Sequence, residues 1–343
     1  MSLPNNKIGI LLINLGTPEA PTTSAVRRYL REFLSDPEVI DLPALFRWLL
    51  LRLIILPLRS KRSARLYQKI WTDRGSPLFL NSQYLHQALS EKMGGKVTIA
   101  LGMRYGNPSL ASALNELSDC RRVVVLPLFP QYATATTRSA IKAIQQLSPH
   151  RLQRTVTITD FFSEDAYINS FSSIIHTALQ DFQADFLLMS YHGIPERQLD
   201  KSLCHSVSCD HQRACPFDLK RNYFCYRAQC YRTSELLANE LSLTQAQYGV
   251  AFQSRLGRLP WIKPYSTDFL AILRKKQIKR LAVVCPSFVG DCLETLEEIG
   301  IRMQEQWKTL GGEAFKLIPA LNANPIWVEE LAKMLENRLS KME

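Results

Sequence analysis

A histidine stands directly after a short apolar run, where parallel sheets carry their functional sites. Residues 186–191 (FLLMSY) are mostly apolar, and His192 follows them before Gly193 and Pro195. Such a run, bounded by turn residues, is typical of a central strand of a parallel sheet. Ligands bind beyond the carboxyl ends of these strands, and imidazole binds metals and takes protons near neutral pH. We predict His192 as a site residue; the alternative is a histidine at the core edge that bonds to a neighbour.

A second apolar run, residues 281–285, leads into an acidic helix start. Asp291 suits the N-cap of that helix, and carboxylates in a first turn are favoured by the helix dipole. Capping would explain Asp291 and Glu294. It explains less well why Glu294 and Glu298 stand four residues apart on one face, where like charges repel by roughly 0.2–0.5 kcal/mol. Facing a cleft, the two carboxylates could bind a cation or pass protons. Together with His192 they predict a hard-metal or proton-transfer site.

The elements that must position these residues occur twice along the chain. Residues 8–18 and 186–195 share an apolar strand, a polar residue and a Gly-x-Pro stop, and residues 123–129 and 282–288 share a strand followed by Pro-x-Phe. Two similar α/β halves, each with a parallel sheet, are the economical interpretation. The sequence contains neither a Gly-x-Gly-x-x-Gly fingerprint nor a Walker A motif, so we predict no nucleotide cofactor.

The length of the chain indicates its domain organisation, and its net charge indicates the kind of binding partner. The 343 residues suit two domains, and we expect residues 1–152 and 153–324 to form them, with a helix over 325–343 packing back on the body. The net charge of +11 favours an anionic partner: nucleic acid, anionic lipid or a small anion. The sequence carries no nucleic-acid-binding motif, so we predict no nucleic-acid partner. The first residues lack a signal-peptide apolar region, which predicts a cytoplasmic protein.

The most hydrophobic stretch, residues 42–58, is LPALFRWLLLRLIILPL. It is shorter than the roughly 20 residues that a membrane span needs, and Arg47 and Arg52 interrupt it between Pro43 and Pro57. One interpretation is a buried helix. We favour an exposed lip over residues 42–65, hereafter the lip segment, that rests on the inner face of the membrane. Its basic residues would touch lipid headgroups; they are Arg47, Arg52, Arg59, Lys61, Arg62 and Arg65.

Five cysteines crowd into one stretch of the second half. In a cytosolic chain such a cluster more often indicates a metal site than disulfides. Their spacing matches neither a zinc ribbon nor a plant-type ferredoxin. We expect an iron–sulfur or zinc site, with reduced surface thiols as the alternative. The cysteines are Cys204, Cys209, Cys215, Cys225 and Cys230, with His205 and His211 among them.

Several motifs in one order, covering nearly the whole chain, resemble those of ferrochelatases, which insert ferrous iron into a porphyrin at the end of haem synthesis. The resemblance implies an α/β fold of two similar Rossmann-like domains with parallel sheets and the active-site cleft between them. It implies His192 and Glu294 as the metal-site pair. The motifs are LLINLGTP (11–18), YLREFLSDPEVID (29–41), RGSPL (74–78), MRYGNPS (103–109), PLFPQYATATT (127–137), SYHGIPER (190–197), FQSRLGRLPWIKPY (252–265) and CLETLEEI (292–299).

The implied reaction needs no ATP. The substrates would be ferrous iron and a porphyrin, protoporphyrin IX or coproporphyrin III, which must lose two pyrrole protons to accept the dication. A tight apolar cleft would bend the ring, His192 would take a pyrrole proton or hand over iron, and Glu294 and Glu298 would carry metal or protons. The alternatives are a cobalt or nickel chelatase of another tetrapyrrole and a haem- or metal-binding protein on the same scaffold.

The chain departs from the metazoan members in its cysteines. Those enzymes hold a 2Fe–2S cluster with one mid-chain and three C-terminal cysteines, whereas Thr134 occupies the mid-chain position here. The cysteine-rich stretch instead resembles an internal mode of cluster binding. We expect a 2Fe–2S cluster on four of the five cysteines, with Cys230 as the fifth.

Overall fold

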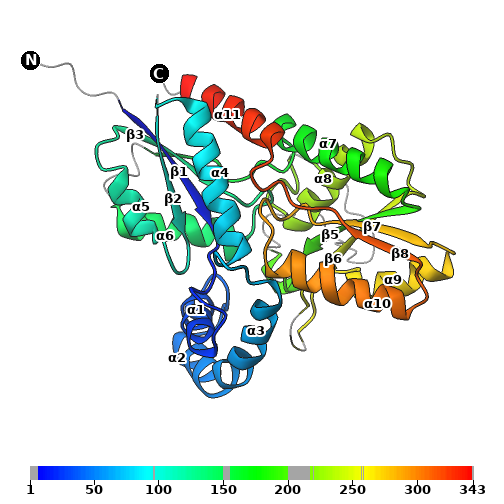
Figure 1. The fold of residues 1–343 in the computed structure, drawn as a ribbon. Helices are drawn as coiled ribbons and strands as arrows, with labels where there is room; N and C mark the ends of the chain where they lie inside the picture. Colours follow the sequence, from blue (N-terminus) through cyan, green and yellow to red (C-terminus); the bar gives the residue numbers. More distant parts are fainter. Residues whose placement is uncertain are drawn as a thin grey trace, which may run out of the picture. The chain divides into compact units, whose positions relative to one another are not determined.

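Each half of the chain forms one four-stranded parallel sheet, and the two sheets share one strand order. The first sheet runs β2-β1-β3-β4 and the second β6-β5-β7-β8, so the expected pair of similar α/β halves is confirmed (Figure 1). The strands are β1 (Ile8–Asn14), β2 (Val97–Met103), β3 (Arg122–Pro127), β4 (Thr155–Thr157), β5 (Phe186–His192), β6 (Tyr248–Gln253), β7 (Arg280–Val284) and β8 (Ala314–Leu317).

The computed structural model describes residues 7–95, 97–149, 155–199, 217–218, 220–255, 257 and 259–341. The chain folds into two compact units. Unit 1 comprises Met1–Phe129, Ala133–Asp160 and Asn322–Glu343. Unit 2 comprises Pro130–Tyr132 and Phe161–Leu321.

Helices cover the sheets in both units. Within the described ranges, three segments are π-helical, with i→i+5 hydrogen bonds: η1 (Leu50–Ile55), η2 (Thr134–Arg138) and η6 (Glu294–Met303). The remaining helices of unit 1 are α1 (Thr23–Ser35), α2 (Ala44–Leu49), α3 (Leu56–Ile70), α4 (Pro77–Met93), α5 (Leu110–Glu116), α6 (Ser139–Leu147) and α11 (Pro325–Ser340). Those of unit 2 are α7 (Asp165–Phe182), the 3₁₀ turn η4 (Glu196–Gln198), α8 (Tyr226–Glu240), α9 (Ser266–Lys275) and α10 (Gln304–Thr309).

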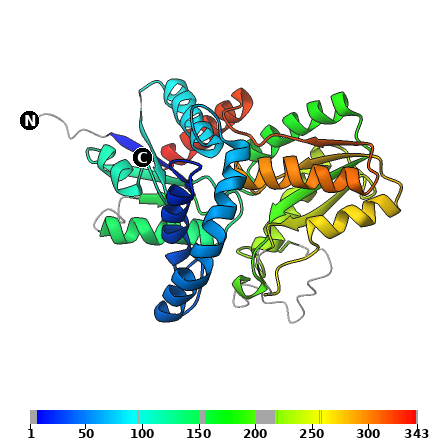
Figure 2. The same cartoon turned by 60° about the horizontal axis from the view of Figure 1, so that its bottom comes forward.

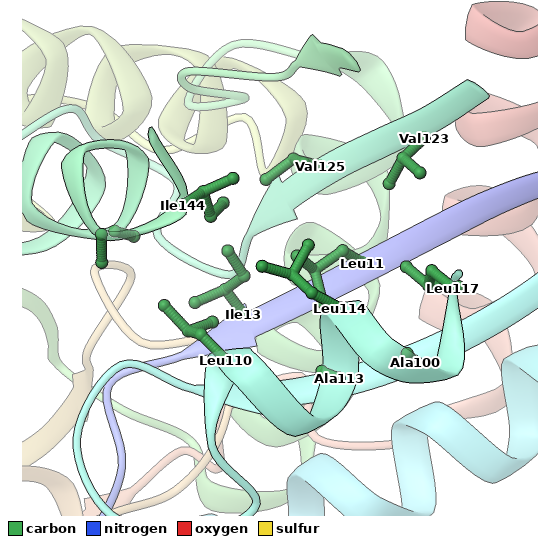
Figure 3. Close-up of a cluster of buried hydrophobic side chains, with 12 residues drawn as sticks. Leu11, Ile13, Ala100, Leu110, Ala113, Leu114, Leu117, Val123, Val125 and Ile144 are labelled. Atoms are coloured by element: carbon green, nitrogen blue, oxygen red, sulfur yellow. The ribbon is translucent and has the colours of Figure 1, made fainter. Parts of the chain in front are cut away.

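In unit 1, α5 and α6 pack on one face of the first sheet (Figure 3). Leu11 and Ile13 of β1 are fully buried there against Leu114 and Ile144. Because β1 is buried on both faces, its sequence is continuously apolar rather than alternating. Truncating one such leucine to alanine costs about 2–5 kcal/mol, so this core fixes the strand that leads into α1.

In unit 2, α9, η6 and α10 cover one face of the second sheet, and α7 and α8 lie on the other (Figure 1). Ile299 and Met303 of η6 and Trp307 of α10 are buried against Leu188 and Val283 of the sheet. These apolar anchors hold η6 by its second half. Its first half, which carries the predicted carboxylates, follows β7 in the chain.

A buried ion pair fixes the end of α1 in unit 1. Asp36, which is 7% exposed, accepts hydrogen bonds from Arg104 Nη2 (2.5 Å), Tyr105 Oη (2.8 Å) and Ser139 Oγ (2.6 Å). Burial alone would raise the pKa of this carboxyl, but the hydrogen bonds from Ser139, the Glu38 amide and Tyr105, with the Arg104 charge, lower it below its ordinary value. The network joins α1 to the end of β2 and the start of α6.

The lip segment is helical without a break through α2, η1 and α3 (Figure 2). Pro57, at the end of the apolar stretch, does not end the helical run, because it lies in the first turn of α3, where a missing N–H is tolerated. The π segment η1 ends just before it, with the Leu56 amide bonded to Leu51 O. Among the described residues, no helix is both long and apolar enough to cross a membrane.

Candidate functional site

His192 ends β5 at the point where the strand order of the second sheet reverses. In a sheet of this order, the second strand along the chain lies on one side of the first strand, and the third lies on the other side. Ligands bind at the point where the strand order reverses in this way, the switch point. Here the switch lies between β5 and β7. The His192 amide donates to Ser287 Oγ at 2.9 Å, so a residue that follows β7 is hydrogen-bonded to the last residue of β5. The His192 side chain is half-buried at this edge.

The His192 ring has a defined tautomer. Its Nδ1 lies 2.6 Å from Gly193 O, and a carbonyl oxygen can only accept, so Nδ1 carries the proton. Nε2 is then the basic nitrogen. Tyr226 Oη donates to His192 O at 2.7 Å; burial first, and nearby Cys230, raise the pKa of Tyr226 well above its ordinary value, so this donor keeps its proton. Two anchors thus fix the backbone and the ring of the histidine.

Apolar rings flank the imidazole. The ring centroids of Trp261 and Phe288 lie 6.4 Å and 6.1 Å from that of His192. Gly193 allows this close packing, since a Cβ there would meet Gln253 O at 2.7 Å and Trp261 Cε3 at 3.3 Å. The histidine therefore sits between aromatic side chains, as a flat apolar ligand would require.

The predicted carboxylates lie in the first half of η6, but they have different partners. Glu298 accepts from both the backbone amide of Ser254 (2.9 Å) and its Oγ (2.7 Å), and Arg302 Nη2 lies 3.8 Å from Glu298 Oε2. Gln253 Nε2 donates to the backbone carbonyl of Glu294 at 2.9 Å, so this contact holds the backbone of Glu294 and not its carboxylate. Both side chains are partly exposed.

The expectation that Asp291 caps the acidic helix is wrong. No side chain caps η6, whose N-cap is Leu293. Asp291 instead accepts from Thr295 Oγ1 at 2.9 Å and from the Ala320 amide at 3.3 Å. The Thr295 hydroxyl and the Ala320 amide thus engage this carboxylate in place of the first-turn amides.

Two buried thiols line the same region. Burial first, and then the negative charges of Asp291 and Glu298, raise the pKa of Cys285 well above its ordinary value. Burial and the charge of Glu294 do the same to the pKa of Cys292. Both thiols therefore keep their protons at neutral pH, and neither acts as a thiolate ligand in this state.

The part of the chain that the structure describes contains no group of three or more His, Cys, Asp and Glu side chains close enough to hold a metal ion. His192 and Glu294 therefore do not belong to such a group among the described residues. The strand register connects them: His192 pairs with Gln253, whose side chain reaches Glu294.

The cysteine-rich stretch is only partly covered. Cys204, Cys209 and Cys215 lie outside the described residues. Cys225 is the N-cap of α8 and is 7% exposed. Cys230, one turn further on, is fully buried, and burial raises its pKa well above the ordinary value. Cys230 therefore has the character of a protonated core thiol rather than a ligand.

Several apolar residues of the lip segment are exposed, whereas Leu51 and Leu56 are buried, at 4% and 5% exposed. Leu45, Phe46, Trp48, Leu53, Ile54 and Leu58 are 51–71% exposed.

Its basic residues are less uniform than expected. Arg47 turns inward and donates to Ile40 O and Leu42 O at 3.2 and 2.7 Å, while Arg52 lies over the Trp48 ring, with Cζ 5.4 Å from its centroid. Arg59 is half-buried, and burial followed by the charge of Arg62 lowers its pKa. Lys61, Arg62 and Arg65 of this helical run are exposed and directly follow the apolar stretch.

Sequence reasoning missed Gln253, Ser254 and Ser287. The first two lie in the motif FQSRLGRLPWIKPY, and Ser287 follows the apolar run of β7. Their order in the sequence gives no sign of their hydrogen bonds, because the partners lie between 41 and 95 residues away.

Comparisons with known proteins indicate one family. The ferrochelatase family model matches residues 7–339. The ferrochelatase of Coxiella burnetii (strain RSA 493 / Nine Mile phase I) is 55% identical over 337 residues, covering 98% of this chain and 95% of the relative. That of Legionella pneumophila (strain Philadelphia 1) is 49% identical over 333 residues, covering 96% and 99%.

Among solved structures, SirB from Bacillus subtilis with Fe3+ has a TM-score of 0.51 at 9% identity, covering 96% of this chain and 94% of that chain. This second likeness concerns the fold alone. The match to the family model over nearly the whole length and the high identity to its curated members show that the chain belongs to the ferrochelatase family, the lyases that insert ferrous iron into a porphyrin to make haem.

Proposed function

We propose that the chain metallates protoporphyrin IX, with coproporphyrin III as the other acceptor to be tested, and that His192 Nε2 accepts a pyrrole proton. The observation that carries this role is the Nδ1 contact to Gly193 O at 2.6 Å, which leaves Nε2 basic. Insertion of ferrous iron releases two protons from the neutral porphyrin, which leaves the ring as a dianion that balances the charge of the iron. A fixed base next to the ring lowers the cost of the first proton transfer.

Glu294 is the group proposed to deliver iron. Its carboxylate is a hard anionic ligand, and it lies on the helix that Gln253 ties to the His192 strand. The described residues hold no closed metal cage. A transfer reaction favours such an incomplete ligand set, because the porphyrin supplies four nitrogen ligands and a tight protein site would retain the ion.

The rings of Trp261 and Phe288 support a role in shaping the porphyrin. Their contacts with the imidazole give an apolar surface beside the base. Pressing a flat ring against a fixed base favours a bent ring, whose nitrogens are more accessible to metal.

A direct test is anaerobic insertion of ferrous iron into each porphyrin, followed by absorbance. We expect haem formation by the parental protein, and His192→Ala to lower the rate at least about 100-fold. His176→Ala, at an exposed position of α7, is the matched control. Haem formation by a folded His192→Ala protein at the parental rate would overturn the role of His192, and insertion of only cobalt or nickel would overturn iron as the substrate.

The lip segment is proposed to rest on an anionic membrane surface. Its exposed apolar side chains, next to the exposed cations Lys61, Arg62 and Arg65, have the composition of an interfacial helix. Porphyrins are poorly soluble in water, so a membrane contact would bring the enzyme to its substrate.

We further propose that a 2Fe–2S cluster is held by Cys204, Cys209, Cys215 and Cys225. The support within the described residues is the contrast between Cys225, at a helix N-terminus where an anion is stabilised, and Cys230, a core thiol. Bound there, the cluster would supply a covalent staple for the stretch. Anaerobically purified protein should contain equimolar iron and sulfide and be coloured, and Cys225→Ser should bleach it while Cys230→Ser leaves the colour. Zinc in place of iron would replace the cluster with a zinc site.

A further inference from the structure

The dipeptide Gln253–Ser254 holds the first half of η6 from the end of β6. Gln253 is 4% exposed. Its Oε1 accepts from Ser190 Oγ at 2.8 Å, and its Nε2 donates to Glu294 O at 2.9 Å. Gln253 also lies opposite His192 in the strand register, and the Gly193 amide donates to Gln253 O at 2.8 Å. One buried side chain thus sets the position of the Glu294 backbone relative to His192.

Ser254 acts on the next turn of η6. Its amide and hydroxyl reach the two oxygens of Glu298, at 2.9 and 2.7 Å. The carboxylate is therefore held by both oxygens and 19% of its side chain is exposed. A carboxylate with a hydrogen bond at each oxygen is a weaker ligand for a passing cation, but it is a fixed negative charge four residues from Glu294.

The backbone of Ser254 indicates that this contact is maintained at a cost. Its φ is +65°, in the left-handed region that glycine adopts readily and other residues adopt with strain. In this conformation both donors of Ser254 point to Glu298. Strain of this kind persists where the surrounding structure enforces it, and it collects at functional sites.

We infer that Ser254 is a positioning residue for iron insertion, which acts by holding Glu298 as an oriented anion behind Glu294 while Gln253 fixes Glu294 relative to His192. The inference rests on the proposed function. Glu298 then assists by its charge, and Glu294 is the carboxylate that meets the iron.

Ser254→Gly tests this directly, because glycine keeps the amide donor, removes the hydroxyl and suits the positive φ. We expect the variant to be at least as stable as the parent, while kcat for iron insertion falls about tenfold and the KM for porphyrin stays constant, as expected for loss of one hydrogen bond to a charged group. Ser242→Gly is the matched control: this serine has a φ of +53° and is exposed at the end of α8. It should keep the parental kcat.

A double-mutant cycle separates positioning from a merely structural role. If Ser254 acts through Glu298, then Ser254→Gly adds no further loss to Glu298→Gln. Parental kcat in Ser254→Gly, or losses that add fully in the double variant, would overturn the inference. Failure of the parental protein to form haem in the same assay would instead overturn the proposed function.

Discussion

Glu294 and Glu298 have the same chemistry and adjoining positions on η6, but the structure gives them different partners. Glu298 is engaged by Ser254 at both oxygens, whereas Glu294 is held through its backbone by Gln253. We therefore expect Glu294→Gln to lower the rate of iron insertion by about 100-fold and Glu298→Gln by about tenfold. Glutamine keeps the shape of the glutamate side chain in both variants, so the loss of rate in each variant measures the contribution of the negative charge at that position.

The measurement is the initial rate of haem formation at limiting ferrous iron. Glu305→Gln, at an exposed position of α10, controls for loss of one negative charge in the same run of helices and should leave the rate unchanged. Equal losses in Glu294→Gln and Glu298→Gln would contradict the division of labour, and parental rates in both would leave η6 without a chemical role.

His192 could be predicted from sequence because an apolar run followed by Gly-x-Pro marks a strand end, and strand ends share one edge of a parallel sheet. Glu294 could be singled out because a like-charged pair on one helix face costs free energy. Gln253 and Ser254 could not be found in this way. Their roles depend on the pairing of β5 with β6 and on a positive φ, which are properties of the folded chain rather than of the local sequence.

At the scale of elements, the sequence predicts where helices lie better than their type. The acidic run after β7 has the pattern of an ordinary capped helix, but it is π-helical over Glu294–Met303. Apolar periodicity reports a helix and its buried face, while the choice between i→i+4 and i→i+5 bonds is decided by what the helix must pack against. Here Ile299 and Met303 are buried in the core of unit 2.

The end of α1 provides a test of an element held by charge. Asp36→Asn removes the anion that Arg104, Tyr105 and Ser139 surround, and we expect the free energy of unfolding to fall by about 3 kcal/mol at pH 7, as for a broken buried ion pair. Urea denaturation, followed by circular dichroism, measures it. Asp119→Asn, in an exposed turn of unit 1, is the control.

The pH dependence of this difference follows from the direction of the Asp36 shift. The pKa of Asp36 in the folded protein is below the ordinary value of an aspartate, so its stabilising contribution is complete above the pKa of the unfolded chain and is lost as the pH falls through the folded-state value. The parent and Asp36→Asn should therefore differ fully at pH 6, begin to converge as the pH falls below about 4, the ordinary pKa of an aspartate, and meet only below the lower pKa of the folded state. A difference that stays constant down to pH 3 would show that Asp36 acts by shape rather than by charge.

At the scale of the whole molecule, one strand order has been used twice, but the two copies of the switch point carry different side chains. β1 ends in Asn14, which donates to Ser82 Oγ at 3.0 Å and is 6% exposed. β5 ends in His192, which is half-buried between aromatic rings. The repeat could be read from the sequence because both copies keep the strand and its stop. The difference in side chain at the strand end is the reason why we propose the base in the second copy.

The proposed membrane contact of the lip segment would bring the whole molecule to its poorly soluble substrate. We expect the protein to bind vesicles that contain about 30% anionic lipid, and charge reversal at Lys61, Arg62 and Arg65 to weaken that binding at least about 100-fold at low salt, since each cation near an anionic surface contributes about 1 kcal/mol. Raising the ionic strength should reduce parental binding for the same reason. Sedimentation with vesicles measures both.

The control for that experiment keeps the net charge equal. Charge reversal at Lys275, Lys276 and Lys308, which are exposed in unit 2, changes the total charge by the same amount and should leave vesicle binding unchanged if the lip segment is the contact. Phe46→Ser with Leu58→Ser should weaken binding at every salt concentration, because these exposed side chains contribute by burial rather than by charge. If neither the charge reversals nor the serine substitutions in the lip segment weaken vesicle binding, the membrane contact lies elsewhere on the protein.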